Sequence, residues 1–262
     1  MPEGHTIHRI SRDHRKRYVG DCLVVSSPQG RFRDGAKRLN GGVLERVEAY
    51  GKHLFYWWEG SLVLHVHLGL YGRFRNHRSP PPDPRGAVRL RVVGSEHAFD
   101  LNGPATCELI QPTERDRIAA RLGQDPLRKD ADPDVAWDRI RRSRTAIGAI
   151  LLNQSVIAGV GNVFRSDVLH ALKIHPERPG QSLDRTQFDQ LWQTLQRMLR
   201  TGVKYNRIVT ADPAEVGKTP GRMRREERLL VYKKHSCHNC GQAIDSWKLG
   251  ARTIYACQRC QT

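Results

Sequence analysis

The chain has 262 residues, with 44 Lys and Arg against 27 Asp and Glu, so its formal net charge at pH 7 is +17. This length can bury a hydrophobic core and favours two domains with a small added module. Basic residues cluster at 8–17, 73–78, 139–144 and 222–228, which favours an extended polyanion as partner. The chain has no apolar run of membrane-spanning length and no signal pattern, so we expect no membrane anchor and a cytoplasmic location.

The first half of the chain predicts one helix followed by short strands. Residues 4–17 have a helical pattern that ends near Gly20. The next runs are rich in Val and aromatic residues, are separated by Gly and Pro, and are expected as strands: 22–26, 43–49, 53–58, 62–68, 88–93 and 97–101. The proline-rich run 80–84 is expected as an exposed connection. This pattern predicts an antiparallel sandwich or barrel.

The second half predicts helices. A polar, proline-bearing stretch at 123–133 is typical of a linker, and apolar residues then recur at helical spacing. We expect one helix around 146–157, a second from Val163 to about Leu172 after a glycine-rich turn, and a third over 185–201. For the third helix, Asp184 is the expected N-cap, Gln187 completes a capping box, and Gly202 is expected to end it.

Four cysteines near the end of the chain have the spacing of a zinc site. Two pairs, Cys237/Cys240 and Cys257/Cys260, each enclose two residues, and sixteen residues separate the pairs. Each pair can direct two sulfurs at one ion, and the middle segment is long enough for a hairpin. Four thiolates leave no open coordination position, so we predict one structural Zn²⁺ without a catalytic role. Two unrelated cysteine pairs or a disulfide cluster are the alternatives. Cys22 and Cys107 are then free thiols, as expected in a reducing cytoplasm.

Pro2 gives the chain a candidate nucleophile. If Met1 is removed, the Pro2 nitrogen is a free secondary amine, and a chain-terminal amine has a reference pKa of about 7.7–8.0. A helix start and many nearby cations lower that pKa further, which favours the neutral amine. A neutral amine can attack a sugar aldehyde carbon and form a Schiff base, with Glu3 as a candidate proton shuttle. From these residues alone, an ordinary Met-Pro-Glu opening is the simpler interpretation.

Two histidines lie two residues apart on an expected strand. His65 and His67 would share one face of the sheet and could hold a metal ion. No third ligand is evident in the sequence, so packed or hydrogen-bonded histidines are the favoured interpretation.

Four segments in this order carry a family resemblance: Met1-Pro-Glu-Gly-His-Thr-Ile-His8, Tyr50-Gly-Lys-His53, Asn153-Gln-Ser-Val-Ile-Ala-Gly-Val-Gly-Asn-Val-Phe-Arg165 and Ala251-Arg-Thr-Ile-Tyr-Ala-Cys-Gln-Arg-Cys-Gln261. Together they resemble the Fpg/Nei family of DNA glycosylase/AP lyases, in particular its endonuclease VIII branch, over nearly the whole chain. The resemblance implies an α+β fold in four parts: an N-terminal catalytic β-sandwich domain with a leading helix (1–122), a linker (123–133), a helix–two-turn–helix DNA-binding domain (134–225) and a zinc-finger hairpin (226–262).

The resemblance also implies catalytic roles. Pro2 would attack the sugar carbon that bears the damaged base, displace the base and leave an imino intermediate. Glu3 would move protons during ring opening and elimination. Lys52 matches the family's strand lysine, which supports sugar opening and contacts phosphate; a surface lysine at a turn is the alternative.

Four further residues match DNA-binding positions. Asn162 falls where the helix–two-turn–helix binds backbone phosphate, beside a Gly-Val-Gly turn that could otherwise be a plain helix connection. Arg252 matches the hairpin arginine that grips phosphate beside the lesion, with a solvated arginine as the alternative. Leu70 and Tyr71 match the wedge that fills the space of an extruded base, although adjacent apolar residues at a strand end are more often core.

Three positions depart from the branch pattern. Gly69 stands where a glutamine is common in the wedge, Thr6 replaces a frequent glutamate, and Asp167 stands where glutamate is common. These departures bear on substrate preference and proton handling rather than on the reaction class.

The expected function is base-excision repair. We expect removal of oxidised bases, preferably pyrimidines, from damaged duplex DNA, followed by strand cleavage through β,δ-elimination. The enzyme would be a monomer of the bacterial cytoplasm, associated with the nucleoid through DNA, and would use no redox cofactor. The alternatives are an Fpg-like preference for oxidised purines and a non-catalytic zinc-containing nucleic-acid-binding protein.

Overall fold

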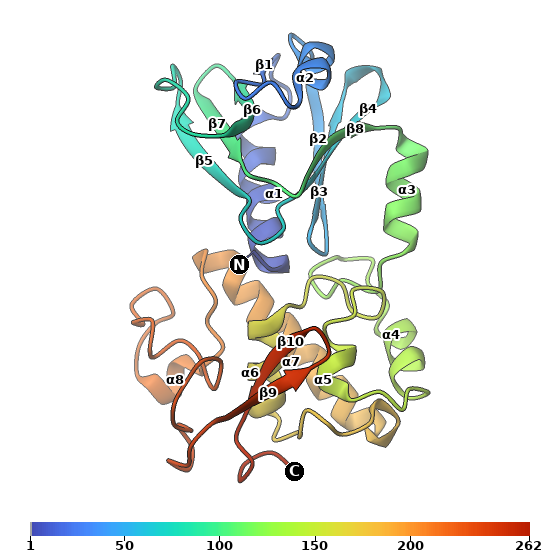
Figure 1. Cartoon of the computed structure of the whole chain (residues 1–262), viewed down its shortest axis with the longest axis vertical. Helices are drawn as coiled ribbons and strands as arrows, with labels where there is room; N and C mark the ends of the chain where they lie inside the picture. Colours follow the sequence, from blue (N-terminus) through green and yellow to red (C-terminus); the bar gives the residue numbers. More distant parts are fainter. Residues whose placement is uncertain (1) are drawn as a thin grey trace. The chain divides into compact units, whose positions relative to one another are not determined.

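A computed structural model describes residues 2–262; Met1, whose removal the proposed chemistry requires, lies outside the described residues. The chain divides into two compact units, which Figure 1 colours along the sequence. The first contains Ile7–Arg121 together with the residues up to Glu3. The second contains Leu122–Thr262 together with Gly4–Thr6. The division therefore cuts the first helix near its start.

Two antiparallel four-stranded sheets build the first unit. One has the strand order β1 (Val24–Ser26), β6 (Val88–Val93), β7 (His97–Asn102), β5 (Arg73–Arg78). The other has the order β2 (Leu44–Tyr50), β3 (His53–Trp58), β4 (Leu62–His67), β8 (Thr106–Ile110). Buried residues of both sheets and of α1 (Gly4–Tyr18) belong to one hydrophobic cluster, as in a sandwich. The α+β class with N-terminal antiparallel sheets is confirmed.

Helix α1 runs between the two sheets. His14 is buried on its inner face, where its Nδ1 lies 2.9 Å from the Tyr56 hydroxyl on β3. The His14 ring also stacks on Phe99 of β7, with centroids 4.5 Å apart, and meets Phe74 of β5 edge-on. One imidazole therefore contacts both sheets.

The six predicted strands form, but four elements of this unit were not predicted. These are β5, β8, α2 (Arg33–Leu39) and α3 (Pro112–Ala120); a short 3₁₀ turn, η1 (Glu59–Ser61), also occurs. Strand β5 has the sequence RFRNHR, which looks like a solvated basic run. It is a strand because it pairs with β7 from Arg73↔Asn102 to Arg78↔His97 at the sheet edge. Charged side chains suit an exposed edge, since they oppose pairing with a further strand.

The second unit contains α4 (Pro133–Ile140), α5 (Ile147–Ile150), α6 (Asn162–Ala171), η2 (Gly180–Ser182), α7 (Arg185–Tyr205), α8 (Pro213–Val216) and the hairpin β9 (Asp245–Leu249)–β10 (Arg252–Ala256). Its core joins the inner faces of α4 to α7. The first helix predicted for this half is shorter than expected, because the chain leaves α5 after Ile150 and continues as turns to α6. No described helix is both long and apolar enough to span a bilayer.

The start of α7 is as predicted, but its end is not. The Asp184 carboxylate accepts the Gln187 amide hydrogen at 2.8 Å, and the Gln187 side chain accepts from the Asp184 amide at 3.2 Å. Gly202 does not end the helix, which continues to Tyr205 and closes at Asn206 with φ +55°. Gly202 serves packing instead: a Cβ there would lie 2.8 Å from the Cβ of His5.

The segment expected as a linker, 123–133, is part of the second compact unit. The Gly123 amide donates to the Gln154 carbonyl at 2.8 Å, and Gln124 pairs with Ile157 in a parallel bridge. A Cβ on Gly123 would lie 2.2 Å from the Val156 carbonyl oxygen, so only glycine fits this approach.

Candidate active site and metal centre

The start of the described chain places two candidate groups beside a helix N-terminus. Pro2 is half-buried and lies before α1, while Glu3 is fully buried at the N-cap position with extended backbone (φ −123°, ψ 178°). The first turn of α1 contains no acidic residue, and its last turn carries three basic ones. The positive end of the helix dipole therefore has only Glu3 as a nearby counter-charge in this segment.

The residues that follow Glu3 pack within the second unit. The Gly4 amide donates to the Gly159 carbonyl at 2.8 Å. The His5 ring meets Phe164 edge-on, with centroids 5.3 Å apart. Burial lowers the pKa of His5 to about 4, so the ring is neutral at pH 7.

Lys52 occupies the tight turn between β2 and β3. The turn has two residues, Gly51 and Lys52, and is closed by the pair Tyr50↔His53. Gly51 has φ +56°, as the first central residue of a primed hairpin turn requires. Lys52 is half-buried. Because the two-residue turn is stiff, it fixes the position of the Lys52 backbone, from which the side chain projects.

Three polar side chains form a hydrogen-bonded chain on the sheet that carries Lys52. His53 Nδ1 lies 2.9 Å from His65 Nε2, and His65 Nδ1 lies 2.9 Å from Glu108 Oε1. The His65–His67 metal alternative finds no support, because in residues 2–262 the cysteine cluster alone gathers three or more metal-ligand side chains. Hydrogen-bonded and packed histidines, the favoured interpretation, are what the structure contains.

Leu70 and Tyr71 lie in the turn after β4, and both are exposed. Leu70 is 46% and Tyr71 is 85% solvent-exposed, so neither is a core residue. Gly69 before them has φ +64°, and a Cβ there would lie 2.8 Å from the Cβ of Ala105. A glutamine at this position would be strained, which gives a physical reason for the departure at Gly69.

The turn before α6 is held by a glutamine that the sequence did not single out. The Gln154 side chain accepts from the Gly159 amide at 3.0 Å and donates to the Val160 carbonyl at 2.9 Å. Gly159 has φ +90°, which favours glycine. Gln154 therefore fixes the turn at Gly159, and the Gly159 carbonyl accepts the hydrogen bond from the Gly4 amide.

Asn162, at the start of α6, is 6% exposed and holds the hairpin that carries Arg252. Its Nδ2 donates to the Thr253 carbonyl at 2.8 Å, while its Oδ1 accepts from Arg165 Nε at 2.9 Å. Arg165 is completely buried, and its Nη atoms donate to the carbonyls of Gly148, Leu249 and Arg252 at 2.9, 3.2 and 3.1 Å. Arg252 is an exposed residue at the start of β10.

Arg165 is thus a positioning residue that sequence reasoning missed. Its guanidinium contacts both ends of the two-residue turn between β9 and β10, directly beside Arg252. The available signal was an arginine within a helix that also carries the apolar residues Val163, Phe164, Val168 and Leu169. A charged residue at such a position is rarely buried without many partners.

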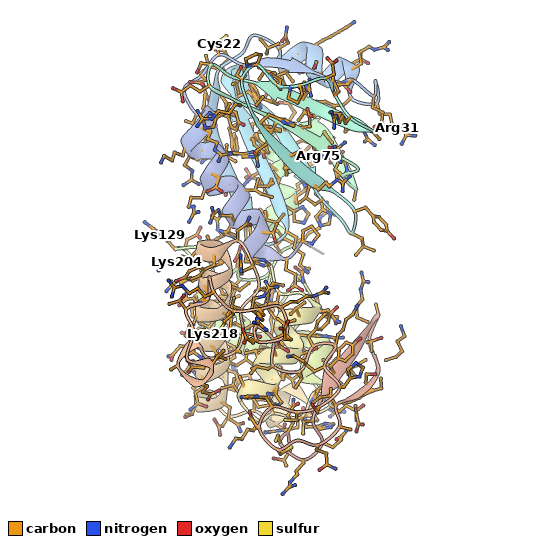
Figure 2. The ribbon with its side chains drawn as sticks, turned by 90° about the vertical axis from the view of Figure 1, so that its left-hand side faces the viewer. Cys22, Arg31, Arg75, Lys129, Lys204 and Lys218 are labelled. Carbon is orange, nitrogen blue, oxygen red and sulfur yellow. The ribbon has the colours of Figure 1, made fainter. Side chains whose placement is uncertain are left out.

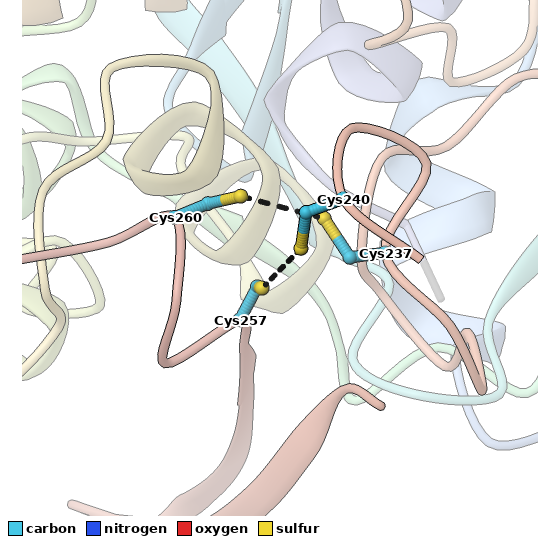
Figure 3. Close-up of side chains that lie close together, drawn as sticks. All are labelled: Cys237, Cys240, Cys257 and Cys260. Carbon is cyan, nitrogen blue, oxygen red and sulfur yellow. Dashed lines mark hydrogen bonds between the residues drawn. The ribbon is translucent and has the colours of Figure 1, made fainter. Parts of the chain in front are cut away.

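The four predicted cysteines converge on one point (Figure 3). All four Sγ atoms lie within 4.8 Å of one another, and the pairs Cys237–Cys260 and Cys240–Cys257 are 3.8 and 3.5 Å apart. Sulfurs at the ordinary Zn–S distance of about 2.3 Å in a tetrahedron are roughly 3.8 Å apart. The donor set and spacing therefore fit a tetrahedral metal ion.

Residues around the cysteines tie this module to the helices. The Gln261 side chain accepts from the Cys257 amide and donates to the Ile174 carbonyl, each at 2.9 Å. His170 of α6 places its Nε2 3.3 Å from Cys237 Sγ. An N–H group at this distance can donate a hydrogen bond to a thiolate that binds a metal ion, and such contacts are common around metal sites.

Asp167 also anchors the approach to the cysteine module. Its buried carboxylate accepts from the Thr210 hydroxyl and from the amides of Leu230, Val231 and Tyr232 at 2.9–3.0 Å. Burial raises the pKa of Asp167, and these four donors act in the opposite direction. Asp167, which stands where a longer glutamate is common, therefore holds the segments at 210 and 230–232 in place within the second unit.

Basic side chains project from both units. Figure 2 labels Arg31 and Arg75 on the first unit and Lys204 and Lys218 on the second. A pocket near the wedge turn is lined by Tyr71, Asn102 and three arginines: Arg73, Arg75 and Arg85. None of these three arginines is ion-paired with an acidic side chain of residues 2–262. Unpaired cationic surface of this kind suits a phosphate backbone.

The family comparisons agree with this geometry. The formamidopyrimidine-DNA glycosylase N-terminal domain model matches residues 1–103, and the formamidopyrimidine-DNA glycosylase H2TH domain model matches residues 122–213. Endonuclease 8 1 of Mycobacterium tuberculosis (strain H37Rv) is 45% identical over 268 residues, which cover both chains completely. Formamidopyrimidine-DNA glycosylase of Thermomicrobium roseum is 27% identical, over 100% of this chain and 99% of its own.

Solved structures agree in fold. A complex of Lactococcus lactis Fpg with DNA containing N7-benzyl-Fapy-dG has a TM-score of 0.82 at 23% identity and covers 99% of each chain. A second complex, of the same enzyme with abasic-site DNA, has a TM-score of 0.81 at 24% identity and covers 99% of each chain. At this identity the structures establish the fold. With the relative at 45% identity, they place the chain in a defined class, the DNA glycosylase/AP lyases. The chain belongs to the Fpg/Nei family.

Proposed function

We propose that this protein removes oxidised bases, preferably pyrimidines, from duplex DNA and then cleaves the strand by β,δ-elimination through a Schiff base on Pro2. The preference rests on the full-length 45% identity to proteins named Endonuclease 8 1, compared with 27% identity to the formamidopyrimidine-DNA glycosylase of Thermomicrobium roseum. The observation that carries the chemistry is the placement of Pro2 next to the N-cap residue Glu3, at the start of a helix whose first turn has no acidic residue.

The electrostatics of this position favour a reactive amine. A terminal amine loses its proton near pH 8, and the positive end of α1 disfavours the charged form. The neutral nitrogen can attack C1′ while the bond to the base breaks and the base leaves with a proton. The C1′–O4′ bond of this adduct then breaks, O4′ takes a proton from Glu3, and the opened sugar is left as an iminium on Pro2. Loss of a 2′ proton then breaks the 3′ C–O bond in β-elimination, and a further proton loss breaks the 5′ C–O bond in δ-elimination.

The other site residues have supporting roles in this proposal. Buried Glu3 delivers and accepts protons at the opening sugar ring, and Lys52 supports ring opening and contacts phosphate. Exposed Leu70 and Tyr71 fill the space of the extruded base.

Two residues of the second unit hold DNA phosphate in this proposal. Arg252 binds phosphate beside the lesion. Asn162 uses its second amide N–H for a phosphate, because Thr253 and Arg165 engage the remainder of the side chain.

We assign the cysteine cluster to one structural Zn²⁺, held by Cys237, Cys240, Cys257 and Cys260. The ion supplies folding free energy and no step of the reaction, since four thiolates complete its coordination. We further propose that the enzyme acts as a monomer in the bacterial cytoplasm, bound to the nucleoid through DNA.

Borohydride reduction with abasic-site DNA tests the Pro2 assignment. We expect a covalent protein–DNA adduct with the wild type and none with Pro2→Gly. Salt-sensitive DNA binding should remain in the variant, because the basic residues are unchanged. Mass spectrometry should show that Met1 is absent. Full strand cleavage by a chain whose first nitrogen is acylated would overturn the assignment.

A lesion panel tests the substrate preference separately. Single-turnover excision of thymine glycol should be faster than excision of 8-oxoguanine from matched duplexes. The reverse order would assign the enzyme to oxidised purines, while the Schiff-base chemistry would stand.

A further inference from the structure

One face of the sheet that carries Lys52 contains a continuous row of polar groups. His53 on β3, His65 on β4 and Glu108 on β8 come from three adjacent strands, and His65 and Glu108 are directly opposed in register. The contacts His53 Nδ1···His65 Nε2 and His65 Nδ1···Glu108 Oε1 are both 2.9 Å long. The His65 ring stacks on Phe55 with centroids 5.0 Å apart, which fixes its plane.

The carboxylate at one end sets the direction of both hydrogen bonds. An ionised Glu108 can only accept, so His65 Nδ1 must carry the hydrogen of that bond. In a neutral His65 ring, Nε2 is then the acceptor and receives the Nδ1–H of His53. A neutral His53 therefore keeps its lone pair on Nε2. The row ends in a proton acceptor beside Lys52.

The two ends of the row differ in exposure. The His65 side chain is 5% exposed, whereas the Glu108 side chain is 52% exposed. Burial lowers the pKa of His53 to about 3, and burial also lowers the pKa of His65. Both rings are therefore neutral at pH 7, as the hydrogen-bond directions require, and the carboxylate end is open to solvent.

Charged groups lie around both ends of this row. Arg46 lies over Trp57 on the same face, and Glu108 lines a pocket together with Asp34 and the arginines Arg31, Arg33 and Arg38. Lys52 precedes His53 at the hairpin turn, and the His67 ring lies 4.9 Å from the His53 ring. Arg115 of α3 lies over Phe55, 5.4 Å from the ring centroid, and is paired with Glu48 of β2. The cation at Lys52 disfavours a lasting positive charge on His53, so a proton taken up there must be passed on.

We propose that His53, His65 and Glu108 form a proton relay between the Lys52 turn and solvent, which serves the proton transfers of the lyase reaction. A proton arrives at His53 Nε2, the Nδ1 proton of His53 moves to His65 Nε2, and the Nδ1 proton of His65 moves to Glu108. Each ring gains one proton and loses one, and Glu108 releases the proton to water. Rotation of the two imidazole rings, or passage of the next proton in the opposite direction, restores the starting tautomers of His53 and His65. The inference rests on the proposed role of Lys52 in that reaction.

Two variants interrupt the relay in different ways. His65→Phe keeps an aromatic ring against Phe55 but removes both nitrogens. Glu108→Gln keeps a hydrogen-bonding group at a half-exposed position but removes the proton acceptor, so it folds even if the first variant does not. Glu45→Gln, an exposed acid on β2 of the same sheet, is the matched control.

The measurement is the single-turnover rate of β-elimination on preformed abasic-site DNA in dilute buffer, with and without added imidazole. Both variants should be slower by about 10²-fold, the lower range for a positioned proton-transfer group. Imidazole should restore much of the rate, because a small proton carrier replaces a relay but not a lost fold. The control should match the wild type.

Unchanged rates in both variants would overturn the relay, and so would a slow rate that imidazole does not restore. Borohydride trapping separates this test from the proposed function. Variants that are trapped like the wild type have intact Schiff-base chemistry, so their elimination rates report on the relay. A wild type that is never trapped contradicts the Pro2 proposal instead.

Discussion

The amide of Gly4 donates a 2.8 Å hydrogen bond to the carbonyl of Gly159, and the two glycines approach closely. A Cβ on Gly4 would lie 2.9 Å from Cα and 3.0 Å from O of Gly159. Gly159 itself needs glycine because its φ is +90°. The start of α1 and the turn before α6 are thus joined where neither residue can carry a side chain, two positions after the candidate nucleophile.

Gly4→Ala should impair catalysis without unfolding the protein. The added methyl must displace backbone, and a displacement on the order of 1 Å at a reacting group can cost about 10²-fold in rate. We expect such a loss in base excision, measured under single-turnover conditions. Gly221→Ala is the control, since its Cβ would meet nothing closer than 3.6 Å. Full activity in Gly4→Ala would show that the close approach does not position Pro2.

Arg165 offers a test of how a buried residue acts on DNA binding. Arg165→Met leaves three carbonyls and the Asn162 Oδ1 without their donor, which should lower the free energy of unfolding by about 3 kcal/mol. Because the Arg252 carbonyl is one of the three, we expect the salt dependence of DNA binding to weaken by about one phosphate contact.

Arg252→Ala should produce the same change in the slope of log affinity against log salt, with little loss of stability. Arg200→Met, an exposed residue of α7, is the stability control. Since Arg165 is completely buried, it cannot contact phosphate itself. An unchanged salt slope in Arg165→Met would mean that Arg252 keeps its position without it.

Tyr71→Ala should separate base extrusion from strand cleavage. Tyr71 is 85% exposed, so its removal should leave the melting temperature nearly unchanged. Loss of the wedge should slow excision of a damaged base from duplex DNA, while cleavage of a preformed abasic site should change little. Val24→Ala, which shortens an apolar side chain that is 60% exposed, is the control. An equal loss on both substrates would argue against the wedge.

Zinc removal should unfold one module and spare the sandwich. Chelation, or Cys240→Ser, should abolish the β9–β10 hairpin and DNA binding, because the four thiolates fix the ends of this segment. The first unit has its own core, so its tryptophan fluorescence should keep a separate unfolding transition. Cys22→Ser, at an exposed free thiol, should change neither property. Metal analysis should give one zinc per chain.

Local chemistry explains which elements were predictable. The capping box at Asp184 and Gln187 and the six Val- and aromatic-rich strands depend on residues close in sequence, and these predictions were confirmed. The cysteine cluster was also predictable, since its ligand spacing is a property of the chain alone. Strand β5 was not, because Phe74 is the one apolar residue among its six and only the pairing with β7 makes them a strand.

The unpredicted parts of the site depend on distant contacts. Gly202 has the residue type of a helix end, but contact with His5, nearly two hundred positions earlier, makes it part of α7. In the sequence, Arg165 cannot be told from the other basic residues, because its burial depends on three carbonyl partners that lie elsewhere in the chain. Likewise, the contact between Glu108 and His65 depends on the pairing of β8 with β4, which joins residues far apart in the sequence.

His14 makes the stability of the first unit depend on pH. Burial lowers the pKa of His14 to about 3, whereas an unfolded histidine has a pKa of about 6.5. Between these values the unfolded chain binds a proton that the folded chain does not. The free energy of unfolding therefore falls as pH drops below about 6.5, with a slope of about 1.4 kcal/mol per pH unit for this residue.

Urea unfolding of the first unit at about pH 7 and about pH 5 measures this slope; the His14 contribution to the loss should be about 2 kcal/mol. His14→Gln should be less stable at pH 7, because it loses the ring contacts with Phe99 and Phe74, but it should lose less on acidification. His97→Gln, at a half-buried position on β7, should keep the wild-type slope. The charged neighbours Asp13 and Arg17 are unchanged in both variants, so they cancel from the comparison. An identical loss in His14→Gln and the wild type would show that other groups, such as the half-buried His53, dominate the acid sensitivity.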